Sequence, residues 1–225
     1  MKISGLEKLT LTDYPNHLAA IIFTQGCNFI CSFCQNSSLI KCSEGLINEC
    51  EVLDYLNKRK NVLEGLVISG GEPTIQKDLE EFIVKVKKLG LKVKLDTNGN
   101  NYELLKKLID SKLVDYVAMD IKTIFEEYDS IIGKKINVEN IKKSIQLLKN
   151  SPIDFEFRTT IIKEFHNEEK IQKIIDYIDG SDYYLQNFQN SSDVIDKSLH
   201  GFTDVELKKL ARKFNKYKNV KIRGI

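Results

Sequence analysis

The sequence has no long apolar run and almost no excess of charge of either sign. The longest early apolar stretch, Leu18 to Phe23, is far too short to span a bilayer, and residues 1–5 do not begin a signal peptide. The 34 basic and 32 acidic residues leave a formal net charge of +2, which does not indicate binding to nucleic acid or to a membrane surface. We therefore expect a cytoplasmic protein that binds neither nucleic acid nor a membrane.

Internal repeats, low-complexity tracts and linkers rich in proline or glycine are also missing, and only three prolines occur. A chain of 225 residues suits one large domain. We predict a single domain over residues 1–225, in which residues 1–17 lead into the first strand. The composition, with 42% hydrophobic and 29% charged residues, is that of an ordinary globular protein.

The chain does contain a regular alternation of short apolar runs and amphipathic stretches. The expected strands are Ala19–Thr24, Gly65–Ser69, Lys92–Asp96, Tyr116–Ile121, Asp154–Ile161, Asp182–Phe188 and Val220–Arg223. The expected helices are Cys50–Lys60, Leu79–Leu89, Tyr102–Lys112, Val138–Asn150, Glu168–Ile178 and Asp204–Lys216. This repetition implies parallel strands joined by right-handed crossovers, in a complete or partial barrel or an open doubly wound sheet. Both architectures place active sites at the carboxyl ends of the strands.

Polar residues occur at or near the carboxyl ends of the expected strands. After the first strand these residues include three cysteines; the later ends carry Gly70, Gly71, Glu72 and Pro73, then Asp96 and Asn98, Asp120 and Lys122, Arg158, and Gln186. One such end is explained by capping of the next helix, since Asp and Asn are common N-caps. Six ends on one rim instead predict a shared pocket.

Three of the five cysteines, Cys27, Cys31 and Cys34, fall within eight residues. In a reducing compartment, cysteines indicate metal binding or reactive chemistry rather than disulfides. Three thiolates at this spacing can hold three irons of a [4Fe–4S] cubane, and the fourth iron then stays open.

A zinc site completed by Cys42, Cys50 or His17 is the alternative. Zinc-binding cysteines usually come as two pairs, and the sequence has no second C-x2-C pair. We therefore favour the cluster, and we expect Cys42 and Cys50 to be buried apolar thiols.

The pattern Cys27-x3-Cys31-x2-Cys34, with Phe33 before the last cysteine, resembles the signature of the radical S-adenosylmethionine (SAM) superfamily. The resemblance implies a partial (β/α)6 TIM-like barrel, a [4Fe–4S] cluster on the three cysteines, and SAM bound to the open iron. Residues 70–73 resemble the second motif of that family, which implies that their backbone and Glu72 contact the SAM amino group. Glycines also let a backbone approach a ligand, and a carboxylate accepts hydrogen bonds from an ammonium group.

Residues 96–99 and 120–122 resemble strand ends in the activating enzymes of glycyl radical enzymes. The resemblance implies that Asp96, Asn98, Asp120 and Lys122 line the SAM site, that the two aspartates share a monovalent cation, and that Lys122 neutralises the SAM carboxylate. Helix N-caps are the alternative role for each aspartate. Arg158, if buried, needs an anionic partner such as the SAM carboxylate or an active-site acid. Gln186 is a further candidate on the rim.

Residues 5–15, followed by residues 23–29, are similar to anaerobic ribonucleoside-triphosphate reductase activating proteins, and the likeness covers nearly the whole chain. It implies that the protein takes a hydrogen atom from one glycine of a glycyl radical enzyme, with an anaerobic ribonucleotide reductase as partner and a flavodoxin or ferredoxin-type protein as electron donor. Asn16 stands where those proteins usually have glycine, and Gln35 where many have histidine.

Two other functions stay open at this point. One is a radical SAM enzyme acting on a small molecule, like 7-carboxy-7-deazaguanine synthase. The other is a non-catalytic zinc-binding module. A second four-cysteine cluster is excluded, because only Cys42 and Cys50 remain. The absence of an auxiliary domain favours a macromolecular substrate that covers the open side of the barrel.

Overall fold

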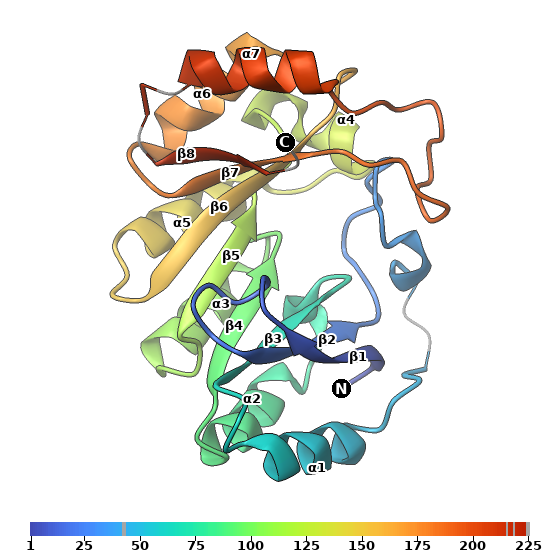
Figure 1. Ribbon diagram of the computed structural model, residues 1–225, viewed down its shortest axis with the longest axis vertical. Helices are drawn as coiled ribbons and strands as arrows, with labels where there is room; N and C mark the ends of the chain where they lie inside the picture. Colours follow the sequence, from blue (N-terminus) through green and yellow to red (C-terminus); the bar gives the residue numbers. More distant parts are fainter. Residues whose placement is uncertain (42–43, 215, 218, 224–225) are drawn as a thin grey trace.

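A single eight-stranded sheet, with its strands in sequence order, forms the centre of the computed structural model (Figure 1). The structure describes residues 1–41, 44–214, 216–217 and 219–223. The strands are β1 (Ile3–Thr10), β2 (Ala19–Thr24), β3 (Gly65–Gly70), β4 (Lys92–Thr97), β5 (Tyr116–Asp120), β6 (Asp154–Ile161), β7 (Tyr183–Asn187) and β8 (Val220–Arg223). All neighbouring pairs from β2 to β8 are parallel. The predicted α/β class is confirmed.

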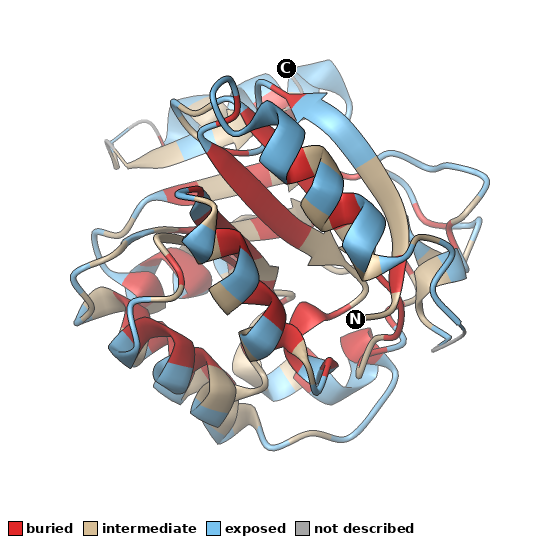
Figure 2. Cartoon of the chain, turned by 90° about the horizontal axis from the view of Figure 1, so that it is seen from below, coloured by how far each residue is buried: buried red, intermediate tan, exposed pale blue. Residues whose placement is uncertain are grey.

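Six long helices follow strands β2 to β7 in turn, as the alternation in the sequence predicts. They are α1 (Glu49–Arg59), α2 (Leu79–Lys88), α3 (Tyr102–Asp110), α5 (Val138–Lys149), α6 (Glu168–Ile178) and α7 (Asp204–Phe214); a short α4 (Tyr128–Ile132) was not expected. Figure 1 shows them along the outer side of the curved sheet, and Figure 2 shows their buried and exposed stripes. Asparagine side chains cap four of them, at Asn48, Asn101, Asn137 and Asn167.

Residues 1–17 are more than a lead-in, because β1 pairs antiparallel with β2, with Ile3 opposite Thr24 and Thr10 opposite Ala19. The sequence-based prediction missed this edge strand, since its middle residues are exposed and carry no clear alternation. The connection to β2 contains Asn16 with φ of 61°. Asparagine tolerates this left-handed conformation better than most residues, which accounts for its presence at a glycine position.

Apolar side chains of β2 and β3 cover the inner face of the sheet at the amino ends of these strands, whereas β4 and β6 place the buried Lys94 and Glu156 on that face. Tyr14 is buried there against Ala19, Ile21 and Val67. Gly65 makes room for this ring, because a Cβ at that position would lie 2.8 Å from Tyr14 Cε1. Side chains thus fill the barrel from the amino end, and its carboxyl end is left for polar groups. No helix in the described part of the chain is long and apolar enough to cross a membrane.

Candidate active site

A cavity of about 250 Å³ lies at the carboxyl ends of strands β3 to β7, facing the loop after β2. Every expected site residue except Pro73 lines it: Cys27, Cys31, Cys34, Gly70, Gly71, Glu72, Asp96, Asn98, Asp120, Lys122, Arg158 and Gln186. Pro73 is buried instead in a short 3-10 helix, Pro73–Ile75. The structure thus brings these polar residues to one cavity, and the roles assigned to them stay predictions.

The three cysteines of the β2 loop hold free thiols on one side of this cavity. Burial raises the pKa of Cys27 to about 12 and that of Cys31 to about 11, so metal binding must displace protons from these thiols. Three thiols on one wall, facing polar groups on the other, fit a cluster that leaves one iron open to a second ligand.

The other cysteines and His17 do not complete a zinc site with them. Cys50 is exposed near the start of α1, so its predicted burial is wrong; the buried positions of that helix are Val52 and Leu56, on another face. Cys42 lies outside the described residues. His17 precedes β2, at the opposite end of the strand from Cys27. Within the described residues, no three His, Cys, Asp or Glu side chains are grouped to hold a single metal ion.

Two glycines fix the distance between the end of β3 and the cysteine loop. A Cβ on Gly71 would lie 2.1 Å from the carbonyl oxygen of Gly26, and one on Gly70, at φ of +111°, would lie 2.2 Å from the amide nitrogen of Thr24. The Glu72 amide donates to the same Gly26 oxygen at 2.8 Å. Contact between two backbones is therefore one physical reason for this pair of glycines, and their predicted contact with a ligand stays a prediction.

Glu72 joins the ends of β3 and β4 from a fully buried position. Its Oε1 accepts hydrogen bonds from Thr97 Oγ1 at 2.7 Å and from the Thr74 amide at 3.1 Å, and its Oε2 accepts one from the Asn98 amide at 2.7 Å. Burial raises the pKa of Glu72, and these hydrogen bonds oppose the rise. Asn98 in turn donates from Nδ2 to Asn28 Oδ1 at 2.7 Å, which connects this wall to the cysteine loop.

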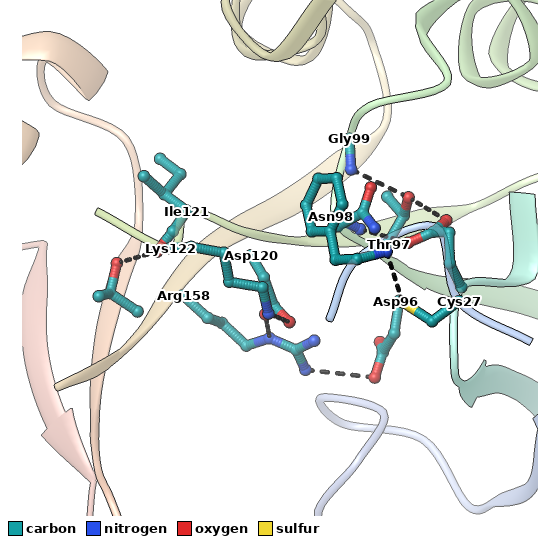
Figure 3. A network of polar contacts seen from close by, with 12 residues as sticks. Cys27, Asp96, Thr97, Asn98, Gly99, Asp120, Ile121, Lys122 and Arg158 are labelled. Atoms are coloured by element: carbon teal, nitrogen blue, oxygen red, sulfur yellow. Dashed lines mark hydrogen bonds and ion pairs between the residues drawn. The ribbon is translucent and has the colours of Figure 1, made fainter. Parts of the chain in front are cut away.

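Charged side chains form the opposite wall, with Arg158 between two aspartates (Figure 3). Arg158 and Asp120 are partners in the β5–β6 register. Arg158 Nε donates to Asp120 Oδ1 at 2.8 Å, and its Nη1 donates to Asp96 Oδ2 at 3.2 Å. Lys122 Nζ donates to the remaining Asp120 oxygen at 3.0 Å. The expected partner of Arg158 is thus an active-site acid, and neither aspartate caps a helix.

These ion pairs dominate the electrostatics of the wall. Burial alone would raise the pKa of Asp120, but Arg158 and Lys122 lower it to about 2. The pKa of Asp96 is also lowered against burial, by Arg158 and Lys94. Burial opposes the charge on Lys122, yet Asp120 raises its pKa above the ordinary value. Asp96, Asp120, Lys122 and Arg158 are therefore charged at neutral pH.

Lys94 is a member of this network that the sequence-based prediction missed. Its side chain is 2% exposed, and its Nζ contacts Asp96 Oδ1 at 2.5 Å. Residues two apart on a strand share a face, so the lysine lies beneath Asp96 on the inner side of the sheet. The available signal was a lysine two residues before Asp96 on the same strand.

Two further residues hold the backbone of Lys122. Its amide donates to the hydroxyl of Tyr128 at 3.0 Å, and its carbonyl contacts His166 Nε2 at 3.0 Å. His166 Nδ1 accepts from the Ile162 amide at 3.1 Å, so its Nε2 carries the proton. Burial lowers the pKa of His166 to about 4, which keeps the ring neutral. Sequence offered no signal for either residue. His166 is 44 residues from Lys122, and Tyr128, six residues from it, meets the Lys122 amide only in the folded chain.

The long β7–α7 connection contacts the cysteine loop from the other side. Gln35 Nε2 donates to the carbonyl of Gln189 at 2.7 Å, Ser38 Oγ donates to Asp193 Oδ2 at 2.9 Å, and the Asp196 amide donates to the carbonyl of Ser32 at 2.9 Å. Gln35 is one of the two departures from the activating-protein pattern, and its side chain thus ties the cysteine loop to the β7–α7 connection.

The comparison with known protein families decides the affiliation, because the profile of the radical SAM superfamily matches residues 21–178. The chain belongs to the radical SAM superfamily. Membership implies a [4Fe–4S] cluster and SAM, which the three thiols and the polar wall of the cavity fit. The alternative of a non-catalytic zinc module is therefore wrong.

Among its relatives, this radical SAM protein is 36% identical to a protein of Methanocaldococcus jannaschii named as a glycyl-radical enzyme activating enzyme, over 99% of this chain and 96% of that one. It is 28% identical to the pyruvate formate-lyase-activating enzyme of Clostridium pasteurianum, over 76% of this chain and 80% of that one. The structure of Streptococcus suis SuiB bound to the precursor peptide SuiA superposes with a TM-score of 0.73 at 17% identity, covering 91% of this chain and 48% of SuiB. That likeness concerns the fold alone.

Proposed function

We propose that this radical SAM protein activates a glycyl radical enzyme by removing a hydrogen atom from one glycine. The observation that carries the proposal is that the three cysteine thiols and the polar strand ends line one cavity. The end-to-end similarity to the M. jannaschii relative supports the choice of substrate class.

The residues of the cavity have separate roles in this proposal. Cys27, Cys31 and Cys34 hold three irons of the cluster. Lys122, with its charge maintained by Asp120, pairs with the SAM carboxylate, and Glu72 Oε2, which accepts one hydrogen bond from the described residues, receives the SAM ammonium. When bound and reduced, the cluster and SAM together supply the carbon radical that abstracts the hydrogen atom.

The partner that we propose is an anaerobic ribonucleotide reductase, with a flavodoxin or ferredoxin-type protein as the one-electron donor. The support is the similarity of residues 5–15 and 23–29 to the activating proteins of that reductase. The structure adds a reason for each departure from the pattern: Asn16 adopts a left-handed conformation, and Gln35 bonds to the β7–α7 connection. Neither departure alters the cysteines.

The test is an anaerobic mixture of the reconstituted protein, SAM, a reductant and the reductase, followed by electron paramagnetic resonance. A glycyl radical signal that needs SAM and disappears with Cys31→Ala is expected. SAM cleavage without this signal would contradict the proposed partner. Formation of a deazaguanine product from the pterin substrate of 7-carboxy-7-deazaguanine synthase would favour the small-molecule alternative.

A further inference from the structure

The two aspartates of the charged wall have no oxygen without a donor. Asp96 Oδ1 contacts Lys94 Nζ at 2.5 Å, and its Oδ2 accepts from Arg158 at 3.2 Å and from Ser69 Oγ at 3.1 Å. Asp120 Oδ1 accepts from Arg158 at 2.8 Å, and its Oδ2 accepts from Lys122 at 3.0 Å. Each of the four carboxylate oxygens is thus paired with a cationic side chain.

The charge balance of this group argues against an added metal ion. Two carboxylates face three cations, Lys94, Lys122 and Arg158, so the group carries an excess of one positive charge (three minus two). The buried Glu156 of β6, which also acts on Arg158, has its own cationic partner in Arg223 at 3.3 Å and leaves this excess unchanged. A monovalent ion between Asp96 and Asp120 would have to displace the Arg158 guanidinium and would raise that excess further. In a buried site such repulsion is costly. The expected shared cation therefore does not fit these residues.

Lys94 is the distinctive member of the three, because it does not line the cavity. Its ammonium is buried with the Asp96 carboxylate as its ion-pair partner and lies 5.7 Å from the centroid of the Tyr116 ring. A buried ammonium is tolerated when it is paired in this way. Lys94 thus forms an ion pair with Asp96 from the side away from the cavity, and it does not contact a ligand bound in the cavity.

We propose that Lys94, together with Arg158, takes the place of a monovalent metal ion at Asp96 and Asp120, so that SAM binding by this chain needs neither K⁺ nor Na⁺. Lys94 is a positioning residue: its fixed charge keeps Asp96 oriented toward Arg158. The inference rests on the proposed SAM site, and it concerns the cation requirement of that site alone.

The experiment measures the SAM dissociation constant of the anaerobically reconstituted enzyme by equilibrium dialysis, in KCl, NaCl or choline chloride at one ionic strength. For the wild-type protein we expect values within about twofold of one another. For Lys94→Met we expect binding about tenfold weaker in choline chloride, with a large part of the loss restored by K⁺. Lys94→Arg should bind without added K⁺, and Lys208→Met, on the exposed face of α7, should behave like the wild type.

The possible outcomes separate the inference from the proposed function. Wild-type binding that requires K⁺ overturns the inference, and so does unchanged binding by Lys94→Met in choline chloride. A loss that K⁺ does not reverse, in a variant with wild-type thermal midpoint and iron content, also overturns it. If Lys94→Met does not fold, the wild-type salt series decides. Absence of SAM binding by the wild-type protein in every salt contradicts the proposed SAM site itself.

Discussion

The two walls of the cavity are held in place by different kinds of interaction. The cysteine loop is fixed mainly through backbone hydrogen bonds. The Gly26 amide donates to the carbonyl oxygen of Leu39 at 2.7 Å, and the Cys27 amide donates to the carbonyl oxygen of Ile40 at 3.1 Å. The opposite wall is fixed by side-chain ion pairs around Arg158. The first wall is therefore sensitive to added volume, and the second to changes of charge and hydrogen bonding.

The largest effect is expected from breaking the first wall at a cluster ligand. Cys31→Ala removes one of three thiols, so the cluster should be lost and SAM cleavage should fall by more than about 100-fold. Iron and sulfide content and the visible absorbance after anaerobic reconstitution report the loss. Cys50→Ala is the matched control, because that thiol is exposed on α1. Full iron content in Cys31→Ala would exclude the ligand assignment.

Added volume in the same wall should cost about 3 kcal/mol or more of unfolding free energy. Gly71→Ala puts a Cβ 2.1 Å from a backbone oxygen of the cysteine loop, so the loop must move and cluster incorporation should fall as well. Gly90→Ala meets no atom within 4 Å but sits at φ of +83°, and should cost only about 1 kcal/mol. Equal effects of the two substitutions in denaturant titrations would refute the backbone-contact explanation.

In the second wall, Tyr128→Phe removes the hydroxyl that accepts from the Lys122 amide. The buried amide is then left unpaired, at a cost of about 2 kcal/mol, and the lysine loses its fixed position, so SAM affinity should fall. Chemical denaturation and SAM binding measure the two effects. Tyr55→Phe removes a hydroxyl that donates to the Lys8 carbonyl, away from the cavity, and should leave SAM affinity unchanged.

The smallest effect is a pH dependence that belongs to the second wall. The pKa of His166 is lowered in the folded protein from 6.5 to about 4, so below pH 6.5 the unfolded chain takes up a proton before the folded one does. Stability is therefore fully present above pH 6.5 and declines as the pH falls toward 4; between pH 7 and 5.5 the loss is about 1 kcal/mol. His166→Gln should flatten this part of the stability curve, and an unchanged slope would assign it to other groups.

The sequence predicted most of the fold, because each βα unit carries its own local pattern. The apolar run of β2 and the helical spacing of Leu104, Leu105, Leu108 and Ile109 identify their elements without tertiary contacts. The short α4 and the edge strand β1 were missed, since both are too short or too exposed to show a period. Cys50 was misplaced because only the packing of α1 decides which face is buried.

The residues that line the cavity at the strand ends could be predicted from the sequence, but the residues that support them from outside the cavity could not. Residues such as Asp96 and Lys122 stand at strand ends, where the rule for parallel sheets places them in one pocket. Lys94 was missed although its partner Asp96 lies two residues along the same strand, because the strand pattern does not show that this lysine is buried and paired. Tyr128 and His166 contact the Lys122 backbone from six and 44 residues further along the chain, and no local pattern indicates either contact. The shared cation was likewise expected from a resemblance that does not include Lys94 or the position of Arg158.

The order of strands and helices and the grouping of three cysteines after an early strand can be read from the chain alone, because these features depend on the spacing of residues. What lies between the two aspartates, how the glycines bring two loops into contact, and which groups hold Lys122 are settled only by folding. Those outcomes depend on charges and volumes from distant segments, whose balance exists only when the barrel has formed.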